Sequence, residues 1–152
     1  ACKSNKMRKC VFLAFFALLA LVVRAQDESG DLVKEGQQMP AFTIVNDNGT
    51  QVPSSSLKGK VILVNFFATW CPPCQKELAE VQKTLWPKYN EKKGFTFPLY
   101  PDKNRAIYGA FAKNLIPRSY LVDKTGKVVY ATKGYSDEEF AELMKKIEAA
   151  LK

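Results

Sequence analysis

A chain of 152 residues with 47% hydrophobic and 25% charged content has the size and composition of one ordinary globular domain. Its formal net charge of +8 is concentrated at the amino end, where residues 1–25 hold five basic and no acidic side chains. The remainder has 18 basic and 15 acidic residues, which argues against nucleic acid binding. Because the chain contains no histidine, Ser-His-Asp and Cys-His catalysis and histidine-ligated metal sites are excluded.

The first segment, residues 1–25, is typical of a secretory signal. The basic start at 7–9 (Met-Arg-Lys) is followed by thirteen apolar residues at 11–23, whereas a membrane span needs roughly 20. Residues 23–25 (Val-Arg-Ala) place compact side chains where a signal peptidase reads, so we expect cleavage after Ala25. An uncleaved membrane anchor is the alternative. In either case the rest of the chain is expected outside the cytoplasm, where disulfides persist.

The chain after the signal begins with a polar stretch. Residues 26–36 are acidic and without periodicity, so we expect a flexible linker ahead of a domain at 37–152. Residues 42–45 are strand-like, and residues 47–49 (Asp-Asn-Gly) predict a tight turn, because asparagine and glycine tolerate positive φ. The strand pattern resumes at Val52, which predicts a hairpin.

The strongest strand signal in the domain is the apolar run at residues 61–67, typical of a central strand covered on both faces. A helix is expected to begin near Pro72 and to end before Pro87. The other predicted elements are a helix at 105–114, strands at 119–123 and 128–131, and a final helix that opens with a capping box at 136–139. The pattern predicts an α/β domain.

The motif that carries chemistry is Cys71-Pro72-Pro73-Cys74, between the predicted strand and its helix. Two cysteines at this spacing can form a disulfide without movement of the backbone. The Cys71 thiol lies at the helix amino end, where free N–H groups and the macrodipole favour an anion, and the thiolate is the attacking species. The Cys74 thiol, one helical turn later, can resolve a mixed disulfide. The motif therefore predicts a redox-active dithiol.

Two other interpretations of the cysteine pair stay open. A structural zinc site needs about four ligands, whereas the chain after Ala25 has two thiols and no histidine, so two copies would have to share the metal. A purely structural disulfide is the other alternative, although a bridge that closes so short a loop constrains the unfolded chain little. We expect no metal and no cofactor.

Residues 59–74 (Gly-Lys-Val-Ile-Leu-Val-Asn-Phe-Phe-Ala-Thr-Trp-Cys-Pro-Pro-Cys) resemble the active-site segment of TlpA-like bacterial thiol–disulfide oxidoreductases of the thioredoxin superfamily. Residues 39–43, with Asn48-Gly49, resemble their amino-terminal hairpin, and residues 116–129 resemble their cis-proline segment. The resemblance covers about residues 37–150. It implies a thioredoxin-like three-layer α/β/α fold with a central mixed sheet and an amino-terminal β-hairpin.

The resemblance also implies a role for each matched residue. Cys71 would be the catalytic nucleophile and Cys74 the resolving thiol of the redox disulfide. The bond before Pro117 would be cis and would form, with Ile116, a ledge that receives the partner's backbone. Trp70 would be a flat apolar contact beside the disulfide, and packing in the core is its alternative. The residues expected to bind substrate are Trp70, Pro72, Pro73, Ile116 and Pro117.

Two features depart from the family pattern. Asn65 stands where reducing thioredoxins have a buried aspartate that handles the proton of the resolving thiol, and an amide cannot exchange that proton. Glu77 is the nearest candidate for proton transfer, and a solvated helix-start residue is its alternative. In addition, no β-branched run follows the first helix, so we expect the sheet to lack one strand and the helix after it unless residues 95–100 occupy that slot, with Pro98 favouring an edge.

The implied activity is reduction of disulfides in exported proteins of a bacterial periplasm or another extracytoplasmic compartment. Apocytochrome c is one expected client class, a membrane protein is the expected electron donor, and contact with the membrane itself is expected only if the signal stays uncleaved. A peroxiredoxin-like thiol peroxidase is an alternative, although Ala68 stands where those enzymes have a threonine. A non-catalytic or metal-delivering binding module of the same fold is the other, although copper carriers use a wider cysteine spacing and histidine.

Overall fold

The structure, a computed structural model, describes residues 30–46, 48–88 and 98–152. The expected signal, its cleavage site and the start of the expected linker lie outside these residues. The described elements are, in chain order, β1 (Thr43–Val45), β2 (Gln51–Pro53), the 3₁₀-helix η1 (Ser54–Leu57), β3 (Ile62–Phe66), α2 (Pro72–Lys88), α3 (Tyr108–Phe111), β4 (Arg118–Val122), β5 (Val128–Lys133) and α4 (Asp137–Ala150). None of the helices in these ranges is long and apolar enough to cross a membrane.

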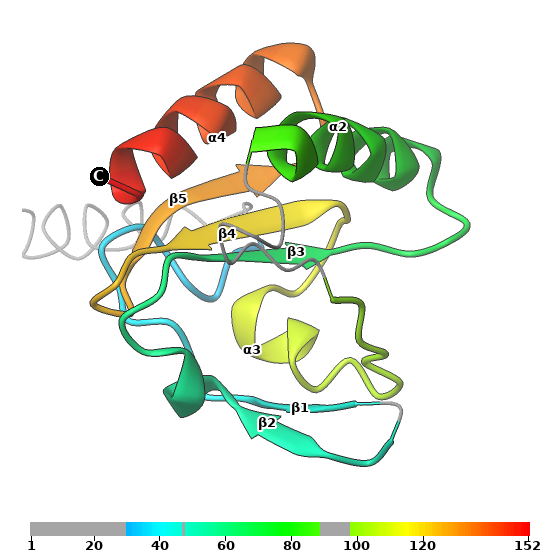
Figure 1. Ribbon diagram of the computed structural model, residues 1–152. Helices are drawn as coiled ribbons and strands as arrows, with labels where there is room; N and C mark the ends of the chain where they lie inside the picture. The colour runs from blue at the N-terminus through cyan, green and yellow to red at the C-terminus, as the bar shows by residue number, and fades with distance from the viewer. Residues whose placement is uncertain (1–29, 47, 89–97) are drawn as a thin grey trace, which may run out of the picture.

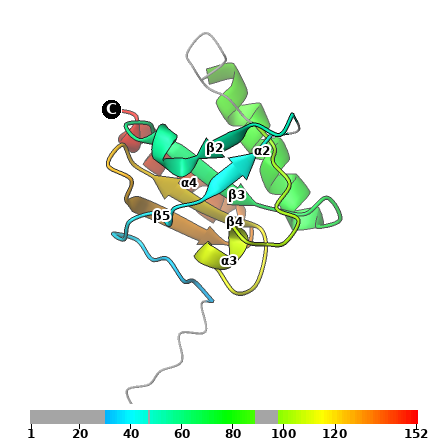
Figure 2. The ribbon, with the colours of Figure 1, turned by 90° about the horizontal axis from the view of Figure 1, so that it is seen from below.

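These elements form three layers around a central sheet (Figure 1). The sheet has the order β3-β4-β5, and both pairings are antiparallel. Helices α2 and α4 cover one face (Figure 1). Helix α3 and the two-stranded β1–β2 sheet lie on the other face, as the view from below shows (Figure 2). The three-layer α/β/α arrangement and the amino-terminal hairpin predicted from the sequence are confirmed.

The core has two halves because successive side chains of a strand point to opposite faces of the sheet. Below the sheet, Phe66 packs against Phe111, with ring centroids 5.2 Å apart. Above it, Leu121 of β4 packs under α2 and α4. The buried members of the two clusters are Val33, Phe111, Tyr120, Val122 and Val128 below the sheet, and Val81, Leu85, Leu121, Leu143 and Ile147 above it. Burial on both faces makes β4 the inaccessible centre of the domain.

The predicted turn and cap signals correspond to local contacts. Gly49 has a φ of 80°, and its N–H donates to the Asn46 carbonyl oxygen at 2.8 Å, which closes the β1–β2 turn. The Ser136 hydroxyl accepts from the backbone N–H of Glu139 at 3.1 Å and caps α4. Local sequence therefore sets these boundaries.

The two remaining helices differ from their predicted lengths. Helix α2 was expected to end before Pro87, yet it continues to Lys88, one residue beyond the proline, so the interruption that proline causes in the hydrogen-bond ladder falls at the end of the helix. Helix α3 is far shorter than the predicted 105–114. Arg105 has a φ of 53°, which no right-handed helix accepts. The Asp102 carboxylate then accepts from the N–H of Tyr108 at 2.8 Å, so the helix starts only there.

The segment predicted as a flexible linker is packed against the domain from Gly30 onward. Asp31 forms a β-bridge with Ala112, and the N–H of Leu32 donates to the carbonyl oxygen of Phe111 at 2.9 Å. Val33 is buried in the lower cluster. The polar composition of this stretch did not predict packing, because Val33 is the only buried apolar side chain among residues 30–36. These residues belong structurally to the domain.

Strand β3 was predicted to be central, but among the described strands it pairs with β4 alone. All five of its residues are partly exposed, whereas those of β4 are all buried. Between α2 and α3 the described residues contain no strand, and residues 98–100, part of the proposed substitute, have no regular structure; residues 95–97 lie outside the described ranges. The apolar character of β3 thus reflects two covered faces at the edge of the described sheet.

The packing of β4 yields a stability prediction. Leu121→Ala should lower the free energy of unfolding by about 2–5 kcal/mol, because Leu121 is fully buried and its removal leaves a cavity. The matched control is Leu151→Ala, at a residue that is 41% exposed; it should change stability by less than about 0.5 kcal/mol. Urea denaturation monitored by circular dichroism measures both. Equal losses in the two variants would contradict the assigned core.

Candidate active site

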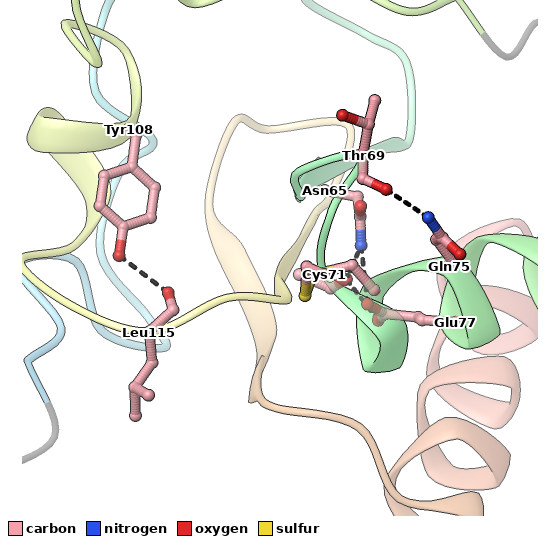
Figure 3. Close-up of a disulfide and its surroundings, with 9 residues drawn as sticks. Asn65, Thr69, Cys71, Gln75, Glu77, Tyr108 and Leu115 are labelled. Carbon is pink, nitrogen blue, oxygen red and sulfur yellow. Dashed lines mark hydrogen bonds between the residues drawn. A yellow bond between two sulfur atoms is a disulfide. The ribbon is translucent and has the colours of Figure 1, made fainter.

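Cys71 and Cys74 form a disulfide at the start of α2, with their Cα atoms 5.3 Å apart (Figure 3). The carbonyl oxygen of Cys71 accepts from the N–H of Gln75 at 3.1 Å, so Cys71 immediately precedes the first helical turn. Its sulfur therefore lies where the partial positive charge of the helix end favours a thiolate. Cys71 is 4% exposed and Cys74 is fully buried. The outer sulfur is the one that a partner can reach.

Apolar side chains surround the disulfide on the protein surface. Trp70 is 78% exposed, so its alternative, packing in the core, is wrong. Pro72 and Pro73 are also exposed. Large exposed aromatic and apolar groups beside a reactive sulfur are suited to contact an apolar segment of another protein.

The Ile116–Pro117 peptide bond is cis, as the resemblance implied. It lies at the disulfide end of the sheet, because Arg118 at the start of β4 pairs with Phe66 at the end of β3. Pro117 is buried and Ile116 is partly exposed. Figure 3 shows the neighbouring Leu115 on the segment that approaches Cys71. The residues predicted to bind substrate from two distant parts of the chain therefore meet at one end of the sheet.

Glu77 lies beneath the disulfide and is 2% exposed, so its alternative role as a solvated helix-start residue is wrong. Its carboxylate accepts from the Ser119 hydroxyl at 2.8 Å and from Nδ2 of Asn65 at 3.0 Å. The same Nδ2 donates to the Ser119 hydroxyl oxygen at 2.7 Å. Asn65 and Ser119 are paired across β3 and β4 and both bond to Glu77 of α2, so both face α2. Figure 3 shows Asn65 beside Glu77. The result is a closed polar triad within an apolar layer.

Burial raises the pKa of Glu77 above its ordinary value. The hydrogen bonds from Ser119 and Asn65 oppose this effect, and the negative charge of Glu139 adds to it. A carboxyl group with a raised pKa exchanges its proton closer to neutral pH than an exposed one does. Glu77 therefore has the burial and the pKa direction of a group that handles protons.

The sequence pattern did not single out Ser119 or Thr132. They face each other across β4 and β5, both are buried, and Thr132 Oγ1 and Asn65 Oδ1 have no hydrogen-bond partner within the described ranges. The available signal was a small hydroxyl residue, serine or threonine, in each of two largely apolar strands. These groups extend the polar region around Glu77 into the sheet.

Comparison with known proteins identifies the family. Residues 34–97 match the Redoxin family. The thiol–disulfide oxidoreductase ResA of Bacillus thuringiensis (strain Al Hakam) is 33% identical over 135 residues, which cover 74% of this chain and 78% of that protein. The chain belongs to the TlpA-like thiol–disulfide oxidoreductases. This TlpA-like protein is an oxidoreductase that acts on disulfides.

Solved structures agree with the TlpA-like assignment. A candidate protein disulfide isomerase from Bacteroides thetaiotaomicron has a TM-score of 0.71 and 33% identity, over 80% of this chain and 92% of that chain. A thiol:disulfide interchange protein DsbE candidate from Chlorobium tepidum has a TM-score of 0.59 and 23% identity, over 79% and 99% of the two chains. The thioredoxin-like fold predicted from the sequence is confirmed.

The buried carboxyl makes stability depend on pH. Folding raises the pKa of Glu77 above its ordinary value of 4.5. The contribution of this group to the free energy of unfolding is therefore complete below pH 4.5, and it is lost as the pH rises through the higher pKa of the folded state. Glu77→Gln should remove this loss, and urea denaturation at about pH 4 and about pH 8 measures it.

The matched control for this measurement is Glu138→Gln, which alters an exposed carboxyl on α4. This variant should keep the pH dependence of the unaltered protein. An unchanged pH dependence in Glu77→Gln would contradict the assigned burial.

Proposed function

We propose that this protein reduces disulfides in exported proteins through Cys71 and Cys74. The observation that carries the proposal is the position of the disulfide: at the α2 amino end, beside the exposed Trp70 and above a buried carboxyl. A helix end lowers the pKa of a thiol and makes it a nucleophile at neutral pH. An apolar rim offers contact area to a protein client.

The reaction takes place in two exchange steps. The Cys71 thiolate of the reduced protein attacks one sulfur of the client disulfide, whose S–S bond breaks as a Cys71–client bond forms, and the other client sulfur leaves as a thiolate. The Cys74 thiolate then attacks the Cys71 sulfur, which releases the second client thiol and forms the Cys71–Cys74 disulfide. Two electrons pass from the protein to the client. A membrane donor of two electrons restores the dithiol.

Glu77 takes part in the second step as a proton acceptor. Cys74 is fully buried, so its proton has no direct path to bulk water. Glu77 follows one helical turn later, and its raised pKa suits a group that gains and loses a proton during turnover. Asn65 holds the carboxylate by hydrogen bonding and cannot itself accept the proton.

The site of action in this proposal is extracytoplasmic. Residues 1–25 have the pattern of a cleaved secretory signal, and a periplasm permits both disulfides and their controlled reduction. Clients are exported proteins with accessible disulfides, with apocytochrome c as one class, because its haem attachment requires reduced cysteines. The catalytic domain comprises residues 37–152 together with the packed residues 30–36.

Trapping of the mixed disulfide tests the order of the two thiols. Cys74→Ala should accumulate a covalent complex with a disulfide client, because no second thiol releases it. Cys71→Ala is the matched control and should form none, because the remaining thiol is buried. Non-reducing electrophoresis and mass spectrometry detect the complex. Turnover of the client by Cys74→Ala at the unaltered rate would contradict the mechanism.

The direction of electron flow has a separate test. A reductant should have a reduction potential near that of thioredoxin, about −270 mV, whereas an oxidant would lie near about −120 mV. Equilibration with dithiol–disulfide buffers, followed by alkylation of free thiols and mass spectrometry, measures the potential of the Cys71–Cys74 pair. Cys74→Ala, with a single thiol in the motif, controls for incomplete alkylation. A value near the oxidant end would reverse the proposed direction.

A further inference from the structure

Residues 112–117 join α3 to β4, and the last four of them form a loop that presents Leu115 and Ile116 beside the disulfide end of the sheet. Leu115 is 57% exposed and has a φ of 64°. This left-handed conformation is unfavourable for leucine, because its Cβ approaches the following carbonyl oxygen. Such a backbone persists only where surrounding contacts hold it. The loop therefore depends on neighbouring side chains for its shape.

Two buried side chains supply these contacts. The Tyr108 hydroxyl donates to the carbonyl oxygen of Leu115 at 2.8 Å (Figure 3). On the other side, Nε of Arg118 donates to the carbonyl oxygen of Asn114 at 2.8 Å, and Nη2 donates to Asn114 Oδ1 at 3.2 Å. Tyr108 is 5% exposed and Arg118 is fully buried. Three hydrogen bonds thus hold two consecutive residues of the loop.

The charge of Arg118 is balanced from the amino-terminal segment. A fully buried guanidinium is costly without a counter-ion, and Nη1 of Arg118 forms an ion pair with the Asp31 carboxylate. The Tyr120 hydroxyl also donates to Asp31, at 2.8 Å. Gly30 packs so closely that an added Cβ would overlap the Asn114 side chain. Residues 30–31 therefore help to fix the guanidinium.

We infer that Tyr108 and Arg118 are positioning residues that hold the substrate-docking loop in its binding shape, and that Asp31 holds Arg118 in place. The inference rests on the proposed function, because it concerns how the same site receives a client. A protein client lies along the loop backbone next to Ile116, so its binding depends on the shape of the loop. A small aromatic disulfide reacts at the Cys71 sulfur and needs no such contact.

Two tyrosines provide a matched test. Tyr108→Phe removes the hydroxyl that holds Leu115, whereas Tyr130→Phe removes a hydroxyl from β5 on the opposite face of the sheet, where Tyr130 packs against the cluster under α4. Tyr108→Phe should raise the KM for a disulfide-containing peptide about fivefold to tenfold, the equivalent of one hydrogen bond, with kcat unchanged. Tyr130→Phe should leave KM within about twofold. Both should reduce dithiobis(nitrobenzoate) at the unaltered rate.

Arg118→Lys separates the charge from the hydrogen bonds. Lysine keeps a cation opposite Asp31, but a single ammonium cannot reproduce the planar set of donors that reaches both oxygens of Asn114. This variant should also raise the peptide KM. NMR resonances of the Leu115 and Ile116 amides, recorded without any client, should shift in Arg118→Lys and Tyr108→Phe and remain in place in Tyr130→Phe.

The outcomes separate this inference from the proposed function. Equal effects of Tyr108→Phe and Tyr130→Phe on peptide KM, or equal effects on the peptide and on the small disulfide, would show that the contacts are merely structural. If the unaltered protein reduces neither substrate, the proposed function fails, and the NMR comparison still decides whether the side chains hold the loop. Unshifted amide resonances in Tyr108→Phe would overturn the inference in that case.

Discussion

The antiparallel pairing of β3 with β4 is the constraint on which the site depends. With Phe66 opposite Arg118, the strand that leads into the disulfide and the loop that leads into β4 meet at one end of the sheet. The next pair, Asn65 with Ser119, points to the opposite face, toward α2. A one-residue slip of β3 against β4 would turn one of these two polar side chains away from Glu77 and would separate the two halves of the site.

The burial of Glu77 costs stability, and the proposed proton transfer explains why a carboxyl group is placed there. The neighbouring side chains Val81 and Leu121 form an apolar layer in which a carboxyl group would ordinarily be replaced by a hydrocarbon side chain. Its two hydrogen bonds reduce the cost of burial without cancelling it, since the pKa remains raised. A buried carboxyl group with a raised pKa exchanges its proton closer to neutral pH than an exposed one does, which suits the proposed proton transfer.

The features predictable from the sequence are those set by residues close together in the chain. The hairpin at Gly49, the cap at Ser136 and the helix end at Cys71 follow from local backbone and hydrogen-bonding rules. The burial of Glu77 and the packing of residues 30–36 depend on strand pairing and on contacts with distant segments, which periodicity does not encode. The same limit explains β3, since an apolar run reports two covered faces and does not distinguish a centre from an edge.

The shortened sheet leaves the site's own supports in place. Every hydrogen bond described around the disulfide and the docking loop comes from β3, β4, α2, the α3 segment or residues 30–31. None of these elements lies where the β–α unit that separates α2 from α3 in the family is expected. Among the described strands, the outer edge of β3 has no ladder partner, and such an edge is a template for pairing with another strand. The geometry of the cysteine pair does not depend on this edge, since the ladder that positions it is on the opposite, β4 side of the strand.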